Sequence, residues 1–461
     1  MEKYVIKEDF LGFTELFSTT GISIKQVILK KLNDFGLSLA NLRGQGYDGG
    51  SNICYLWIIG VHNGVQALIL EEQPLALYTH CFSHGLNLAI SKACEIPAIR
   101  NMFGIVGSVS VFLSLSAKRN NTLIRVISND STESHPNKIK LKALCATRWV
   151  ERHNSIIMFH DLYKFILIAL EELEKDSNRE TSYKAANFNS SVRRSEFLVS
   201  LEIVANLFAY TKTLSIQLQS SKQDLSMAQK NIKNIIALFN SIRENPEDTF
   251  NSLFENAAKK AQMFGEKIKI PRLCGQQTQR SNIVVREPMD WFKVTIFIPF
   301  LDHIIHELDS RFNEKFNNII ALEGLIPSNI NFYDTKSILE SAKFYCDDIE
   351  GSDLELKAEI HLWKNKWTNV QNNPQTAVEA LEYCNEFFPN IKILLQIFAT
   401  LPVSTATAER SFSTLRRLKN YLRSTMSEVR LNGSAMLNIH KEIDIKQVVD
   451  TFAQKKKGGW N

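Results

Sequence analysis

A cysteine and a histidine three residues apart are the side chains here that most directly suggest chemistry. Cys81 and His84 form a Cys-x-x-His pair, and thiolate and imidazole groups at short spacing are ligands that Zn²⁺ favours. A structural zinc site needs four such ligands, and the other candidates are His62, His80 and Cys94, at spacings unlike those of known zinc fingers. The alternative, which the spacing favours, is a buried cysteine beside a hydrogen-bonded histidine.

Two carboxylates stand in unusual local contexts. Asp48 lies in the glycine-rich stretch Arg43–Asn52 (RGQGYDGGSN), and Glu409 lies in Thr405–Arg410 (TATAER). Taken one at a time, the first is explained by an Asp-Gly turn and the second by an acid in the first turn of a helix, where the helix dipole favours it.

Short strands are predicted directly before the Asp48 turn and directly before Cys81. We expect a buried strand at Leu39–Arg43 to run into the glycine-rich turn, and a second strand at Ala76–His80 to lead into a helix that opens at Cys81. Ligands bind at such strand ends in α/β sheets. The aromatic run Phe10–Phe17 and the helical spacing of Ile22–Phe35 complete a predicted mixed α/β layer.

A helical block is predicted from there to about residue 370. Phe197–Leu218 and Ala228–Ile242 carry apolar stripes at helical spacing, which indicate core packing. Ser128–Lys138 and Lys175–Ser191 are rich in Ser, Asn and charge, and we expect them to be loops. Ile391–Arg423 has the pattern of two amphipathic helices broken near Pro402.

Composition places the chain among globular proteins. It has 461 residues, 44% of them hydrophobic and 22% charged, which is enough for two or three domains. The seven cysteines are scattered and never form a Cys-x-x-Cys pair, which indicates a reduced compartment, and we expect no signal peptide and no membrane span. The net charge of +5 is compatible with nucleic-acid binding but does not diagnose it. The sequence has no Walker-type, Gly-x-Ser-x-Gly or His-Glu-x-x-His motif.

Several separated motifs, in this order, resemble those of hAT-superfamily DNA transposases and of the transposase-derived proteins of the MYM-type zinc-finger group. The resemblance runs from about Phe10 to about His440. The motifs are Arg43–Asn52 (RGQGYDGGSN), His80–Leu88 (HCFSHGLNL), Cys145–Arg152 (CATRWVER), Pro271–Arg272 and Ala408–Ser413 (AERSFS).

The resemblance implies an α/β fold with a large all-α insertion, in which a partial RNase H-like fold is completed by a helical C-terminal dimerisation segment. On this basis we expect four parts, which are the RNase H-like part at 1–95, the helical insertion at 96–370, the dimerisation segment at 371–445 and a basic tail at 446–461.

In the resembling family, three carboxylates hold two divalent ions that cleave and join DNA strands. Asp48 matches the second carboxylate and Glu409 the third, so both are predicted as remnant catalytic and metal-binding residues. The first should lie on an upstream strand, yet the early acids are Glu2, Glu8, Asp9 and Glu15, none in a buried-strand pattern. We therefore expect the first strand to be missing from this chain, and magnesium to bind only if the site is completed.

The resemblance also implies DNA-contacting and dimer-forming residues. Cys81 and His84 match a motif near the family's active site, and Trp149 matches a tryptophan that stacks on a flipped base, although partly buried core is an equal alternative. Arg148 is predicted to contact phosphate, and Arg152, Arg272 and Arg280 could do the same. A solvated surface position is an equal alternative for all four. The predicted dimerisation residues are Phe412, Leu415, Leu418 and Leu422.

The sequence therefore predicts a domesticated or decayed hAT transposase-like nuclear protein without catalytic activity, which needs no cofactor, binds DNA, and forms homo- or hetero-oligomers through its C-terminal segment. The alternative is a functional transposase subunit whose N-terminal strand and zinc finger are absent from this chain.

Overall fold

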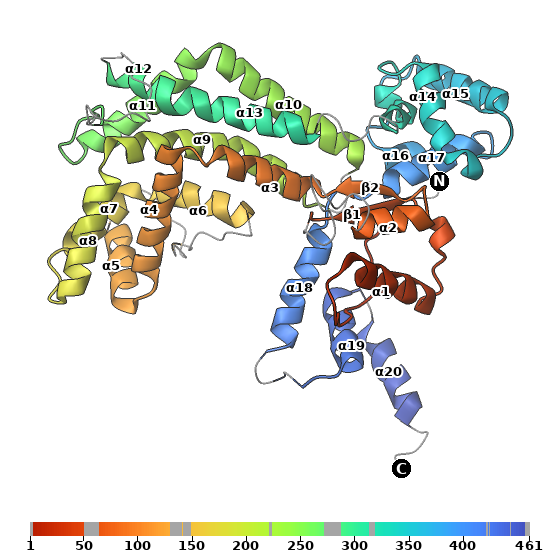
Figure 1. Ribbon diagram of the computed structural model, residues 1–461, viewed down its shortest axis with the longest axis horizontal. Helices are drawn as coiled ribbons and strands as arrows, with labels where there is room; N and C mark the ends of the chain where they lie inside the picture. The colour runs from red at the N-terminus through yellow and green to blue at the C-terminus, as the bar shows by residue number, and fades with distance from the viewer. Residues whose placement is uncertain are drawn as a thin grey trace. The chain divides into compact units, whose positions relative to one another are not determined.

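The computed structural model describes residues 3–49, 64–129, 141, 149–220, 224–271, 287–312, 319–420, 423, 425–442 and 444–456. The chain is mostly helical, as predicted, and divides into two compact units (Figure 1). The first unit holds residues 1–84, 218–228 and 316–461, and the second holds residues 85–217 and 229–315. The expected four-part division, with its helical insertion at 96–370, stays a prediction.

The strands found in the described residues form one parallel pair. β1 (Gly44–Tyr47) lies beside β2 (Leu77–His80), with Tyr47 opposite His80. One face of the pair is covered by α2 (Val65–Glu72), which in turn packs on α1 (Gly21–Asp34). The buried Gln45 side chain donates from Nε2 to the carbonyls of Gln66 (3.1 Å) and Ala76 (3.0 Å), which fixes α2 against β1.

Helices and short helical turns make up the rest of the first unit. Arg43 forms a two-point ion pair with Asp348, in which its Nε donates to Oδ2 over 2.6 Å. This pair joins the start of β1 to a segment some three hundred residues later. The elements are η1 (Leu39–Asn41), η3 (Ile320–Leu325), η4 (Pro327–Asn329), α14 (Thr335–Ala342), η5 (Lys343–Asp348), α15 (Asp353–Trp367), α16 (Ala377–Leu381), α17 (Pro389–Thr400), α18 (Ala406–Leu418), α19 (Glu428–Ile439) and α20 (Ile445–Lys456).

The second unit is built around the long helix α9 (Ser195–Gln217), whose predicted apolar stripe is buried. α4 (Pro97–Ser114), α6 (Trp149–Asp161) and α11 (Pro246–Gln262) pack directly on it. α3 (Phe82–Ala93) and α10 (Leu225–Glu244) begin within the residues of the first unit and continue into the second. The other elements of the second unit are α5 (Ala117–Ser128), α7 (Tyr163–Leu173), α8 (Arg179–Val192), α12 (Pro288–Phe292), the π-helical η2 (Lys293–Phe297) and α13 (Ile298–Phe312).

A buried polar cluster joins three helices of the second unit. His160 on α6 lies 3.1 Å from the Glu202 carboxylate on α9, and Lys260 on α11 forms an ion pair with the same carboxylate. Burial opposes the charge on His160, but hydrogen bonds to Asp161 and Glu202 outweigh it and raise the His160 pKa. Burial likewise opposes the charge on Glu202, but His160 and Lys260 lower its pKa.

Two helices of this unit are long and apolar enough, by composition alone, to cross a membrane. They are α4 and α9. Half of the α4 window and 72% of the α9 window are buried inside the protein, and core packing accounts for their hydropathy.

Three local predictions were wrong. The strand starts at Gly44 rather than at Leu39, because Ser38 accepts a hydrogen bond from the Ala40 N–H and begins the 3₁₀ turn η1 instead. The predicted loop at Lys175–Ser191 contains α8, which begins after the capping residue Asn178. Phe10–Phe17 forms no strand or helix, and most of Ser128–Lys138 lies outside the described residues.

Candidate functional site

The carboxyl ends of β1 and β2 meet at one edge of the sheet, because the two strands are parallel and in register. Asp48 directly follows β1, and Cys81 directly follows β2. The Cys81 N–H donates to the Tyr47 carbonyl over 3.0 Å. We call this place, with Asp48, His80, Cys81 and His84, the strand-end site.

The segment between α17 and α18 passes over the same two strands. The Thr79 hydroxyl donates to the Pro402 carbonyl over 2.6 Å, and the Phe82 N–H donates to the Val403 carbonyl over 2.9 Å. A Cβ atom on Gly44 or on Gly46 would lie 2.8 Å from the Pro402 side chain. The two glycines are therefore needed for the close approach of this segment to β1.

Cys81 connects the strand-end site to α18. Its thiol is 1% exposed, and its Sγ accepts hydrogen bonds from the backbone N–H of His84 (3.4 Å) and of Thr405 (3.3 Å). The first bond is that of a helix cap, since it satisfies an N–H in the first turn of α3. The second fixes the residue just before α18, with Ser404 Oγ 3.8 Å from the same sulfur.

Glu409 lies in the first turn of α18 and is exposed. Its carboxylate accepts a hydrogen bond from the Thr405 hydroxyl over 3.0 Å. Cys81 thus contacts both Tyr47, next to Asp48, and Thr405, which holds Glu409. The two predicted carboxylates are brought to the same edge of the sheet through one shared residue.

The turn after Asp48 wraps against a histidine. Gly49 has φ +80° and packs so closely on the His80 ring that a Cβ there would overlap it. The Tyr78 hydroxyl lies 3.0 Å from His80 Nδ1, and the His80 and His84 rings meet edge to face with centroids 5.5 Å apart. The turn that follows the exposed Asp48 therefore packs on an imidazole that also contacts a phenol hydroxyl.

Within the described residues, no three His, Cys, Asp or Glu side chains are grouped closely enough to hold a metal ion. Asp48 and Glu409 alone do not fit the two-ion site of the family, which takes three carboxylates. We therefore derive no metal-dependent step from these residues.

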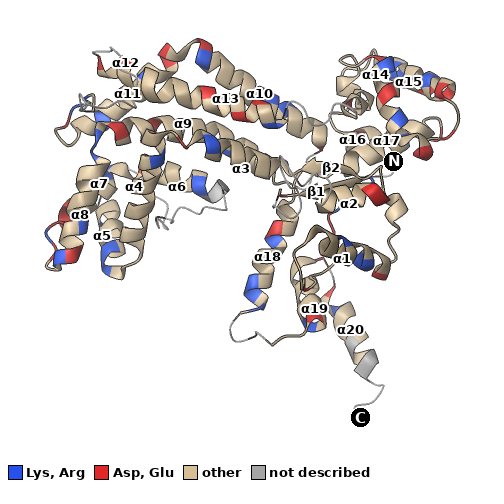
Figure 2. Ribbon diagram, viewed as in Figure 1, with Lys and Arg blue, Asp and Glu red and all other residues tan. Residues whose placement is uncertain are grey.

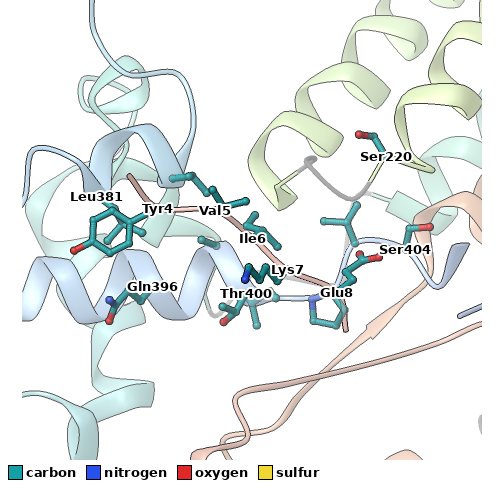
Figure 3. A pocket seen from close by; sticks show the side chains of 15 residues that line it. Tyr4, Val5, Ile6, Lys7, Glu8, Ser220, Leu381, Gln396, Thr400 and Ser404 are labelled. Carbon is teal, nitrogen blue, oxygen red and sulfur yellow. The ribbon is translucent and has the colours of Figure 1, made fainter. Parts of the chain in front are cut away.

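A cavity of about 260 Å³ is lined in part by the segment that leads to α18 (Figure 3). The extended chain Tyr4–Glu8 lines it together with Ala399–Ser404, and most of the lining is apolar. Of the early acids in the sequence, Glu8, Asp9 and Glu15 are exposed and outside any strand, and Glu2 lies outside the described residues.

The other predicted DNA contacts are described only in part. Trp149 begins α6, but its side chain is outside the described part of the structure, as are Arg148, Arg272 and Arg280. Arg152 lies over the Phe103 ring, 4.2 Å from its centroid, and burial lowers its pKa. This arginine is packed in the second unit rather than freely solvated.

The predicted dimerisation residues lie on or just after α18. Phe412 is 62% exposed, whereas Leu415 and Leu418 are half-buried, and Leu422 lies outside the described residues. The Phe412 ring contacts Phe13, with centroids 5.8 Å apart.

Sequence reasoning missed the residue that holds this N-terminal segment. Asn432 on α19 accepts from the Phe13 N–H (2.7 Å) and donates to the Phe13 carbonyl (2.8 Å), so its amide replaces a neighbouring strand. His440 Nε2 donates to the Phe10 carbonyl over 3.1 Å. No local pattern around an isolated asparagine predicts a partner 419 residues away.

Comparison with known protein families gives matches for an N-terminal and a C-terminal segment of the chain. Residues 1–56 match the ZMYM1/FAM200, RNase-like domain, and residues 356–443 match the hAT family C-terminal dimerisation region. Asp48 falls in the first match, and Glu409 and the predicted dimerisation residues fall in the second. The predicted resemblance to hAT transposase-derived proteins is confirmed.

Nearly the whole chain is similar to two curated relatives. It is 28% identical over 465 residues to the human (Homo sapiens) 52 kDa repressor of the inhibitor of the protein kinase, covering 98% of this chain and 60% of the relative. The mouse (Mus musculus) protein of the same name is 28% identical over 460 residues, covering 97% of this chain and 60% of the relative. The chain thus spans about 60% of the length of these relatives.

Proposed function

We propose that this chain is a domesticated or decayed hAT transposase-like protein that binds nucleic acid and dimerises, and that it does not cut DNA by itself. The observation that carries the proposal is the strand-end site, where Cys81 joins the Asp48 turn to the start of α18. The site keeps the scaffold of a transposase centre and, among the residues that the structure describes, presents two carboxylates where the family has three.

The proposal includes a partial RNase H-like core. Its support is the parallel pair β1–β2, the helix that follows β2, and the C-terminal segment that returns over the strands into α18. The match of residues 1–56 to an RNase-like domain agrees with this reading.

The proposed inactivity follows from ligand number. Two ions that share a bridging carboxylate position the attacking and leaving oxygens of a phosphodiester, and losing that ligand removes much of the positioning that lowers the barrier. Asp48 and Glu409 are exposed, and the described residues offer them no third His, Cys, Asp or Glu ligand. Magnesium would act here only if a third carboxylate were supplied.

Nucleic-acid binding is supported by exposed cations on the helix that begins at the strand-end site. The last turn of α18 and the residues after it carry Arg416, Arg417 and Lys419, all exposed (Figure 2). Guanidinium and ammonium groups bind phosphate irrespective of base sequence. A nuclear location follows from a nucleic-acid partner and agrees with the word repressor in the names of both relatives.

The proposal is tested by measuring binding of the purified chain to fluorescent duplex DNA by anisotropy. We expect binding that weakens steeply with salt, that persists in EDTA, and that the double substitution Asp48→Ala/Glu409→Ala leaves unchanged. Arg416→Ala/Arg417→Ala should weaken it, and Lys336→Ala/Lys343→Ala, which removes exposed lysines of α14 and η5, is the matched control. Binding that requires both a divalent ion and the two carboxylates would contradict the proposal.

A second candidate is a functional transposase subunit, because Asp48 and Glu409 keep their positions at one sheet edge. The observation that would favour this candidate over the first is a longer gene product that adds an upstream strand with an Asp. If that product cleaves transposon-end DNA in magnesium and Asp48→Asn abolishes cleavage, the second candidate holds.

A further inference from the structure

An aromatic segment from the beginning of the chain is built into the C-terminal helices. Phe10 contacts Phe13, with ring centroids 4.8 Å apart, and Phe13 contacts Phe412 on α18. Asn432 and His440 hold the backbone of the same segment through hydrogen bonds. In Figure 1 this segment runs just before α1, near α18 and α19.

The rings leave a large apolar area open to solvent. Phe17, at the end of the segment, is 96% exposed, and Phe412 is 62% exposed. Leu11 and Leu16 are also exposed, and Leu11 lines a groove with Phe13, Phe35 and Asn432. We call Phe10, Phe13, Phe17 and Phe412 the aromatic face. Phe10 and Phe13 are half-buried, whereas Phe17 and Phe412 are exposed. Exposed rings on segments that also carry a half-buried aromatic cluster mark an interaction surface.

The two parts of this surface carry opposite charges. Residues 8–20 contain three acids, Glu8, Asp9 and Glu15, and no base, whereas residues 410–423 contain five bases and no acid. The three acids are exposed, as are Arg416, Arg417 and Lys419 (Figure 2). A surface with one acidic half and one basic half is complementary to itself when turned by a two-fold rotation.

We propose that the aromatic face binds a second copy of this chain, so that the acidic segment of each copy lies against the basic end of α18 of the other. This inference rests on the proposed dimerisation and adds the N-terminal segment to the interface. The segment lies outside residues 356–443, to which the dimerisation match is confined, but it is continuous with them through the Phe13–Phe412 contact.

Self-complementary charge is the reason for choosing a second copy. The three acids beside the rings would repel a nucleic acid from the aromatic face, so we expect a nucleic acid to contact the basic end of α18 alone. An unrelated protein would need both a matching apolar surface and a matching charge pattern. A second copy supplies both through the same residues, which is the property of an isologous interface.

The apolar part is tested by sedimentation velocity over a concentration series. We expect the unaltered full chain to dimerise, and Phe17→Ser and Phe412→Ser each to raise the dimer dissociation constant by roughly tenfold or more, because each removes an exposed ring from both copies. Phe332→Ser is the matched control, since Phe332 is 80% exposed but lies after η4. It should leave the dissociation constant unchanged.

The charged part is tested by mixing two variants. Asp9→Lys/Glu15→Lys makes both halves basic, and Arg416→Glu/Arg417→Glu/Lys419→Glu, which leaves two bases and three acids in residues 410–423, makes both halves acidic. Each variant alone should be repelled from its own copies and dimerise more weakly, whereas an equimolar mixture should restore the dimer as a heterodimer. Neither misfolding nor charge pairing within one chain would produce that restoration.

The outcomes separate this inference from the proposed function. A dimer that weakens with Phe17→Ser but not with Phe332→Ser, and that the mixture restores, supports the inference. A dimer unaffected by Phe17→Ser, or a mixture that stays monomeric, overturns the inference and leaves the proposed dimerisation standing. A monomeric unaltered chain at tens of micromolar overturns both.

Discussion

At the scale of single residues, Cys81 is the residue that links the parts of the strand-end site. The sequence motif predicted a cysteine near a DNA-handling centre, with zinc as the rival reading. In the structure its sulfur is buried and accepts two backbone N–H groups, one from α3 and one from the residue before α18. Its contribution is to hold two distant pieces of backbone together, and a role in DNA contact stays a prediction.

The thiol's hydrogen bonds predict an ordering of substitutions. Cys81→Ala removes the acceptor from both N–H groups and should lower the free energy of unfolding by about 1–2 kcal/mol. Cys81→Ser keeps an acceptor and should lose less. Denaturant unfolding of both variants measures the difference, and equal losses would show that packing rather than hydrogen bonding matters at this position.

Gly49 makes a second residue-scale prediction. A side chain there would be strained at φ +80° and would also overlap the His80 ring, so Gly49→Ala should destabilise the chain by about 1–3 kcal/mol. Gly36→Ala is the control, because Gly36 has φ +70° but nothing within 4 Å of its Cβ position. If the two substitutions cost the same, the His80 contact adds nothing.

At the scale of elements, periodicity predicted several helices and the helical character of the middle of the chain, and it missed features with long-range causes. The stripes at Phe197–Leu218 and Ala228–Ile242 appear as α9 and α10, and the break near Pro402 separates α17 from α18. The sequence did not predict β1, because it contains two glycines. These glycines are explained by the Pro402 segment, which packs directly on them. α8 was missed because its polar surface resembles a loop, although its cap Asn178 was visible in the sequence.

The polar cluster of α6, α9 and α11 predicts a pH dependence. The folded-state pKa of His160 is raised above 6.5, so its stabilisation is present below about pH 6.5 and is lost as the pH rises through the folded pKa. The pKa of Glu202 is lowered from 4.5, so its contribution is present above that pH and is lost as the pH falls through the lowered value.

The measurement is thermal unfolding at pH 5.5 and pH 8 for the unaltered chain and for His160→Gln. The unaltered chain should lose more stability between these pH values than the variant does. His303→Gln, an exposed histidine of α13, should behave like the unaltered chain. A pH response unchanged by His160→Gln would show that the cluster does not hold a protonated imidazole.

At the scale of the whole molecule, segments more than 300 residues apart in the sequence are held together by hydrogen bonds and an ion pair. β1 and β2 are covered by residues 402–405, the start of β1 is tied to Asp348, and Phe13 is held by Asn432. The order of motifs, which resembles that of a known family, predicted that the segment before α18 returns to the strands that precede Asp48 and Cys81, and Cys81 contacts both Tyr47 and Thr405. A shared role of Asp48 and Glu409 stays a prediction. The pairing of Phe13 with Asn432 could not be predicted. One side-chain amide forms hydrogen bonds with the N–H and the carbonyl of Phe13, and a single asparagine leaves no periodic pattern in the sequence.

The proposed function holds that this chain keeps the scaffold of a transposase centre but does not cut DNA by itself. The direct measurement is incubation of the purified full chain with end-labelled duplex DNA in magnesium and in manganese, with products resolved on a denaturing gel. We expect intact DNA, identical to that seen with Asp48→Ala/Glu409→Ala. Cleavage by the unaltered chain that the double substitution abolishes would contradict it.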